Sequence, residues 1–158
     1  EVNRSNLKDG NYYMNDDGTL AYDSSGDKVT LTYGTSTAKE IADTKWTQKE
    51  IDDGDAPTGA DTNTVKTTGL TNIHKDKISG EAHSRLQSTD WYACRKAEAG
   101  TAIPSAVATY RAAVRTAAAD MHTKIDAADT LAKLEALYVY NTDNPPTRPL
   151  GEWPDPVE

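Results

Sequence analysis

The chain is short of the large apolar side chains from which proteins build their cores. It contains no phenylalanine, and leucine, isoleucine and valine together account for 22 of its 158 residues. An acidic chain with so few large aliphatic residues approaches the composition of disordered proteins. We therefore expect that it closes only a thin core by itself, and that neighbouring subunits help to order it as they would inside an assembly.

Cysteine, positive charge and long apolar runs are also scarce. The single cysteine, Cys94, excludes an intrachain disulfide, and we expect it to be a small buried side chain. The 17 Lys and Arg residues are outnumbered by 25 Asp and Glu, which gives a net charge of −8. Phosphate contacts require a basic face, so we expect no nucleic-acid partner. No segment approaches the roughly 18 apolar residues of a membrane helix, so we expect no membrane partner.

Patterns that carry enzymatic or metal chemistry are missing as well. The three histidines, His74, His83 and His122, are scattered along the chain without the spacing of a metal site. The acidic runs at 16–17 and 52–55 do not match the ligand spacing of a calcium loop, and turn chemistry accounts for them. There is no nucleophile elbow and no phosphate-binding glycine loop. We predict a non-enzymatic protein with no catalytic residues, no cofactor and no metal.

Residues 1–54 predict a small β-rich unit in the form of a β-meander. Apolar residues alternate with polar ones near 12–14, 20–22 and 29–33, as they do in half-buried strands. Turn sequences rich in Asp, Ser and Gly separate these runs. Three short strands with one modest apolar face are marginal by themselves, so this unit needs something to pack on.

Two helical turns and a linker are expected next. A capping-box pattern, in which Thr is followed three residues later by Glu, occurs twice and favours short helical turns near 38–44 and 48–52. Residues 55–72 contain Pro57 and many Thr, Asp and Asn, with little to bury. This stretch predicts a linker or an extended arm between a β-rich front and a helical back.

Residues 73–158 predict a helical module, whose strongest helix is expected at about 105–127. Apolar residues recur there at steps of three and four. A break at Asp126 or Asp129 precedes a shorter helix, and so short a turn predicts an antiparallel helical hairpin. The expected seam of this hairpin consists of Val107, Val114, Met121, Ile125, Leu131 and Leu134.

Two further segments flank the expected hairpin. The apolar face from Ile78 to Leu86 predicts one helix before it, and Thr89 is positioned to cap a second one that runs to Ala97. The five prolines after Asn141 exclude a helix and predict an extended C-terminal tail, held to the surface by Trp153. The fold class is therefore expected to be α+β, with the β-meander followed by the helical hairpin module and the Pro-rich tail.

Three motifs occur in order within the helical module. They read R-L-x-x-T-D-W from Arg85 to Trp91, Y-R-x-x-V-R from Tyr110 to Arg115, and W-P at Trp153. This order resembles the tail assembly chaperone module of tailed bacteriophages, which also occurs near the ends of tail-fibre assembly proteins. The resemblance covers roughly residues 83–158, and the helical part at 116–140 is longer than in the compact module. It implies a non-enzymatic role in the assembly of tail or tail-fibre components.

The candidate partner-binding residues belong to the three residue types that most often dominate protein interfaces, namely Trp, Tyr and Arg. They are Trp91, Tyr92, Arg95, Tyr110, Arg111, Arg115 and Trp153. A second interpretation remains open, in which acidic residues pair with the arginines inside the fold and the two tryptophans belong to the core.

Two kinds of function compete. The one we favour is a small virion component of the tail or tail fibre, which docks to other virion proteins and is oligomeric or embedded in an assembly. The alternatives are a transient tail or tail-fibre assembly chaperone that is absent from the mature particle, and a head-decoration or baseplate-peripheral protein. A thin core favours a protein ordered by its neighbours, so the expected location is the virion, assembled in the cytoplasm of the bacterial host.

Overall fold

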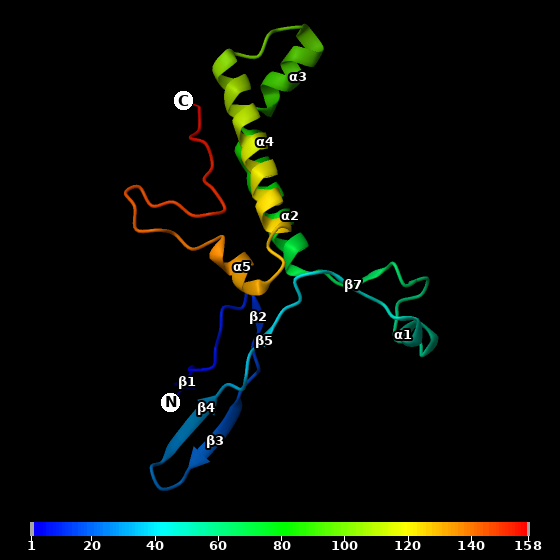
Figure 1. Cartoon of the computed structure of the whole chain (residues 1–158), viewed down its shortest axis with the longest axis vertical. Coiled ribbons are helices and arrows are strands. Elements are labelled where there is room, and N and C mark those ends of the chain that lie inside the picture. Colours follow the sequence, from blue (N-terminus) through cyan, green and yellow to red (C-terminus); the bar gives the residue numbers. More distant parts are fainter. Residues whose placement is uncertain (1, 158) are drawn as a thin grey trace. The chain divides into compact units, whose positions relative to one another are not determined.

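The structure is a computed structural model in which residues 2–157 are described (Figure 1). The chain forms two compact units, Glu1–Leu70 and Thr71–Glu158. The described strands all lie in the first unit, whereas helices dominate the second. The predicted α+β fold class is therefore confirmed.

The first unit contains short strands that pair in three separate sheets. The strands are β1 (Val2–Asn3), β2 (Tyr13–Met14), β3 (Thr19–Asp23), β4 (Lys28–Thr32), β5 (Thr37–Ala38), β6 (Thr44–Lys45) and β7 (Val65–Thr67). The largest sheet has the order β1-β4-β3, in which β3 and β4 form an antiparallel hairpin and β1 runs parallel to β4. β2 pairs with β5 and β6 pairs with β7, both antiparallel.

The predicted meander is correct for one hairpin and wrong for its first strand. The β3–β4 pairing brings Leu20 opposite Leu31, on the face that the alternation predicted. β2 leaves this sheet, because Thr37 and Ala38 are extended rather than helical and pair with it instead. The backbone N–H of Lys39 continues this pairing by donating to the Tyr12 carbonyl at 2.9 Å. The first Thr-x-x-Glu pattern therefore contributes to a strand rather than a helix, because its backbone pairs with β2.

The second capping box forms as predicted and starts helix α1 (Gln48–Asp52). The backbone N–H of Glu50 donates to the Thr47 hydroxyl at 3.3 Å, and the N–H of Thr47 donates to the Glu50 carboxylate at 2.9 Å. An ion pair with Lys66 and the bonds from Thr47 lower the pKa of Glu50 to about 2. Because both side chains are still partly accessible to solvent, this ion pair contributes little to stability.

The stretch predicted as a linker, residues 55–72, contains a paired strand and belongs to the first unit as far as Leu70. β7 pairs with β6, and the ammonium of Lys66 lies 4.7 Å from the centre of the Trp46 ring. The backbone N–H of Leu70 donates to the Glu40 carbonyl at 2.9 Å. The boundary between the units therefore falls after Leu70. The polar residues around β7 did not predict that this strand would pair with β6.

The second unit contains two long helices and two shorter ones. They are α2 (Leu70–Gln87), which begins at the last residue of the first unit, α3 (Asp90–Ala99), α4 (Ser105–Asp126) and α5 (Leu131–Ala136). α2 and α4 run side by side in opposite directions (Figure 1). Lys75 near the start of α2 pairs with Asp126 at the end of α4 at 2.9 Å, and Tyr110 near the start of α4 donates to the Arg85 carbonyl near the end of α2 at 3.4 Å.

The predicted hairpin partner of α4 is therefore corrected from α5 to α2. The expected seam is largely right, because Val107, Val114, Met121, Ile125 and Leu134 are buried and Leu131 is half-buried. α5 has only six residues and cannot cover a helix of 22. Ile78 of α2 is buried as well, so the apolar face predicted from Ile78 to Leu86 supplies the long antiparallel surface.

The C-terminal tail is extended, as predicted, and is attached to the helices at several points. Leu150 is completely buried, and its backbone N–H donates to the Leu137 carbonyl at 2.9 Å. The ammonium of Lys124 donates to the Leu150 carbonyl at 3.1 Å. Gly151 follows with a φ of +107°, which lets the chain turn directly above Met121. The tail is thus part of the second unit's core.

Candidate partner-binding surface

The junction between α2 and α3 is held by Arg111 of α4. Its guanidinium donates to the Leu86 carbonyl at 3.1 Å and to the Thr89 hydroxyl at 2.7 Å, and it pairs with the Asp90 carboxylate at 2.9 Å. Only 7% of Arg111 is exposed. Thr89 does not cap α3 as predicted, because its hydroxyl donates to the Leu86 carbonyl and accepts from Arg111. Arg111 therefore supports this junction from within.

The Y-R-x-x-V-R motif contains two further candidate partner-binding residues, of which one is buried and the other is exposed. Tyr110 is buried beside the Arg85 carbonyl that accepts from its hydroxyl. Arg115 is exposed, and one of its guanidinium nitrogens donates to the Arg111 carbonyl one turn earlier at 3.4 Å. Of this motif, only Arg115 is placed to meet another protein.

Trp91, Tyr92 and Arg95 lie together on α3, and we call them the α3 aromatic patch. The two ring centres are 3.8 Å apart, and the Arg95 guanidinium lies 4.7 Å from the Trp91 ring and 5.3 Å from the Tyr92 ring. Trp91 is 51% exposed, so it is not the core residue of the second interpretation. α3 contains no buried residue at all, and Cys94, expected inside, is exposed on the same helix.

The surroundings of Arg95 hold its side chain in place within the α3 aromatic patch. Its Nε atom is covered by neighbouring atoms and has no hydrogen-bond partner within the described residues. The stacking of a guanidinium on aromatic rings keeps the side chain in one place. The patch thus presents a pre-ordered cation with two aromatic rings, which favours recognition of another surface.

Trp153 has a separate role in the tail. Its indole N–H donates to the Glu81 carboxylate of α2 at 2.8 Å, and the Arg85 guanidinium lies 5.0 Å from its ring. It is half-buried by these contacts. Trp153 therefore attaches the tail to α2; the sequence predicted that Trp153 holds the tail to the surface, but not to which helix. The acceptor, Glu81, carried no signal in the sequence because the two residues are 72 positions apart.

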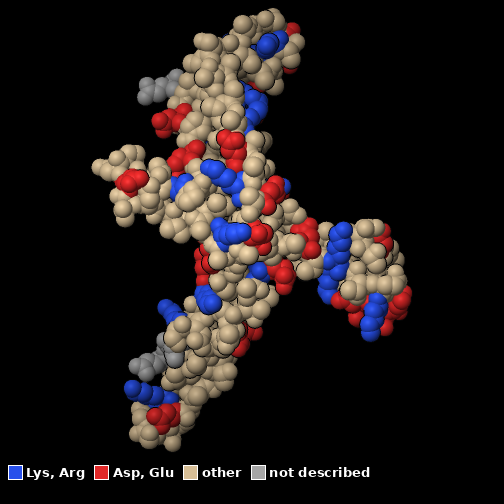
Figure 2. Space-filling model, viewed as in Figure 1, with Lys and Arg blue, Asp and Glu red and all other residues tan. Residues whose placement is uncertain are grey.

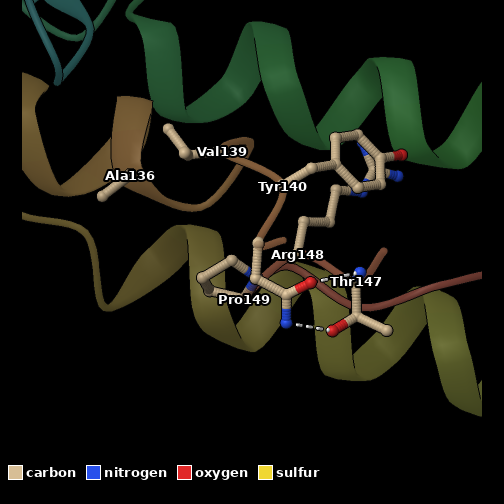
Figure 3. A pocket seen from close by; sticks show the side chains of 7 residues that line it. Ala136, Val139, Tyr140, Thr147, Arg148 and Pro149 are labelled. Carbon is tan, nitrogen blue, oxygen red and sulfur yellow. Dashed lines mark hydrogen bonds between the residues drawn. The ribbon is translucent and has the colours of Figure 1, made fainter. Parts of the chain in front are cut away.

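An open pocket lies between α5 and the tail, outside the α3 aromatic patch (Figure 3). Its volume is about 490 Å³. The amide of Asn141 donates to the Thr147 hydroxyl at 2.8 Å and accepts from the Thr147 backbone N–H at 2.8 Å. Arg148 donates to the Gly151 carbonyl at 3.2 Å and stacks on Tyr140. These polar groups stabilise the loop itself and indicate no ligand. The lining residues are Ala136, Val139, Tyr140, Asn141, Thr147, Arg148 and Pro149.

Charge and metal chemistry do not single out another site. Figure 2 shows Lys and Arg side chains intermixed with Asp and Glu on the visible face. Within residues 2–157, no three His, Cys, Asp or Glu side chains gather closely enough to hold a metal ion. In the same part of the chain, no helix combines the length and the apolar character needed to cross a bilayer.

No protein-family model, no curated protein and no solved structure matches this chain.

Proposed function

We propose that the chain is a non-enzymatic component of a tailed-phage virion, in the tail or the tail fibre, and that it docks to a partner subunit through the α3 aromatic patch. The observation that carries the proposal is the exposure of Trp91 beside Tyr92 and Arg95 on a helix with no buried residue. Packing within the chain stabilises such a helix only a little. Burial of its aromatic face against a partner would stabilise it.

The contacts among the three phage-like motifs support the proposal. Arg111 of the second motif bonds Thr89 and Asp90 of the first. Trp153 of the third stacks on Arg85 of the first. Arg111 therefore supports the helix junction at which the α3 aromatic patch begins, and Trp153 attaches the tail to the helix that leads to this junction.

Incorporation into particles tests the proposal. Particles of the phage that encodes the chain would be produced with the wild-type chain or with Trp91→Ala, and its copy number measured by mass spectrometry. We expect stoichiometric wild-type chain and strong loss of the variant. Removal of an interface Trp typically costs about 2 kcal/mol, or roughly thirtyfold in affinity. Arg115→Ala tests the exposed end of the second motif in the same way.

Tyr140→Ala is a matched control, because Tyr140 is an equally exposed aromatic side chain outside the α3 aromatic patch. It should leave incorporation unchanged, and circular dichroism should show that all variants are folded. Absence of the wild-type chain from purified particles would overturn the virion assignment in favour of a transient chaperone. Full incorporation of folded Trp91→Ala would overturn the assignment of the patch.

A further inference from the structure

Strand β3 is an unprotected edge of the first unit's largest sheet. The sheet order is β1-β4-β3, and all five residues of β3 are exposed. Proteins usually protect such edges with Lys, Pro or a bulge, because a bare edge pairs with other strands. β3 reads Thr-Leu-Ala-Tyr-Asp, and its five pairs with β4 continue without a register shift. It contains no Lys, no Pro and no bulge, and its one charged side chain, Asp23, is its last residue.

The face of this hairpin is apolar as well as open. Leu20 is 70% exposed and Tyr22 is 65% exposed, although each stands opposite an aliphatic residue of β4. Leu20 pairs with Leu31, and Tyr22 pairs with Val29. These apolar residues form a row that ends at the unpaired edge of the sheet. Such a row favours pairing with another strand that has the same alternation of apolar and polar residues.

We infer that β3 pairs with β3 of a second copy of this chain, antiparallel and across a two-fold axis at Ala21. Side chains alternate between the two faces, so a register shifted by one residue would place the apolar faces on opposite sides of the joined sheet. Among the registers that keep these faces together, the one centred on Ala21 uses all five residues of β3. It places Leu20 opposite the partner's Tyr22, and Tyr22 opposite the partner's Leu20.

Charge agrees with this register. Asp23 stands opposite Lys28 within its own hairpin. In the dimer, its other neighbour is Thr19 of the partner subunit, so no like charges meet. A register centred on Asp23 would keep the apolar faces together but would bring the two copies of Asp23 directly opposite each other, which is unfavourable. The same strand pairs on both sides of the axis, so the assembly closes as a dimer.

Charge substitutions at the two-fold axis test this pairing, and the test does not depend on the phage assignment. An interface of this size is weak, so the full chain would be studied by sedimentation velocity from roughly 10 µM to roughly 1 mM. We expect concentration-dependent dimers of the wild-type chain. Ala21→Lys and Ala21→Glu each place like charges opposite each other and should be monomeric, with at least a tenfold weaker association.

An equimolar mixture of Ala21→Lys and Ala21→Glu should dimerise again, because opposite charges then meet at the axis. Thr30→Lys is the matched control: Thr30 stands opposite Ala21 on the same face but on the inner strand, and its substitution should leave the dimer intact. A wild-type chain that stays monomeric overturns the inference. So do dimers that both Ala21 variants retain, or a mixture that fails to associate while each variant keeps the circular dichroism of the folded chain.

Discussion

Arg111 is a charged side chain inside the second unit, and its contribution to stability depends on the groups that accept its hydrogen bonds. Arg111→Ala would remove the donor to the Thr89 hydroxyl and the cation that pairs with Asp90, whereas the Leu86 carbonyl would still accept from Thr89. We expect a loss of about 3 kcal/mol in the free energy of unfolding. Arg115→Ala, at the exposed end of the same motif, should change it by no more than about 0.5 kcal/mol. Urea unfolding followed by helical circular dichroism compares the two, and equal losses would contradict the interior role of Arg111.

We expect His74 to make the stability of the second unit depend on pH. It is buried with its Nδ1 atom 2.6 Å from the Tyr138 hydroxyl, and burial, followed by the charge of Lys77, lowers its pKa below the ordinary 6.5. Below about pH 6.5 the unfolded chain therefore binds a proton that the folded chain does not, so stability falls as the pH falls. Above that pH His74 is neutral in both states and its contribution is constant.

The pH dependence is measured as the difference between urea midpoints at about pH 7.5 and about pH 5.5, on either side of the ordinary histidine pKa. His74→Gln should reduce this difference, because the titrating group is gone, whatever the variant does to absolute stability. If wild type and variant lose the same stability over this range, other groups are responsible.

At the scale of elements, the turn at 40–43 and the start of α2 depend on one glycine. The backbone N–H of Gly69 donates to the Asp43 carboxylate at 2.7 Å. A Cβ atom at Gly69 would overlap the backbone of Ala42 and the carbonyl oxygen of Ile41. Backbone atoms cannot move aside as the end of a flexible side chain can, so we expect Gly69→Ala to cost about 3 kcal/mol.

Hydrogen exchange read by mass spectrometry locates the effect of Gly69→Ala. Peptides that cover residues 37–70 should lose protection, and those from α4 should keep it. Gly10→Ala is the control, because a Cβ at Gly10 meets no atom within 4 Å. Unchanged protection at 37–70 in Gly69→Ala would show that the turn can open without loss of the fold.

At the scale of the whole molecule, the two units differ in how much core they contain. Among the buried apolar side chains of the described residues, only Tyr12 and Leu70 belong to the first unit. The hydrophobic contribution, about 25 cal/mol per Å² of buried apolar area, is correspondingly small there. The second unit has the continuous seam of α4 and α2. The thin core expected from composition is thus concentrated in one half of the chain.

We expect the isolated chain to be marginally stable, with the first unit unfolding before the second. Calorimetry should give a broad or two-step transition, and the early step should shift upward with protein concentration if β3 self-association stabilises the first unit. A single sharp transition above roughly 65 °C, the upper end for ordinary mesophilic domains, would contradict this prediction.

Local patterns in the sequence predicted a large part of the elements. Steps of three and four residues predicted α4, a Thr followed by Glu predicted the capping box of α1, and alternation predicted the strands near 20–22 and 29–33. The prolines predicted the extended tail. Each of these signals arises within a few residues, where backbone geometry and side-chain spacing are enough to favour one structure.

The partners of these elements were decided only by the tertiary structure. Nothing local indicates that α4 packs on α2 or that β2 pairs with β5, because such pairings compare surfaces far apart in the chain. The same limit applies to the candidate surface. Residue type made both Arg111 and Trp91 candidates for the partner surface. Arg111 is buried because three acceptors distant in sequence bind its guanidinium, whereas none of the described residues of the second unit covers α3 deeply enough to bury Trp91. Residue type is a property of the sequence, but burial is a property of the neighbours that folding brings.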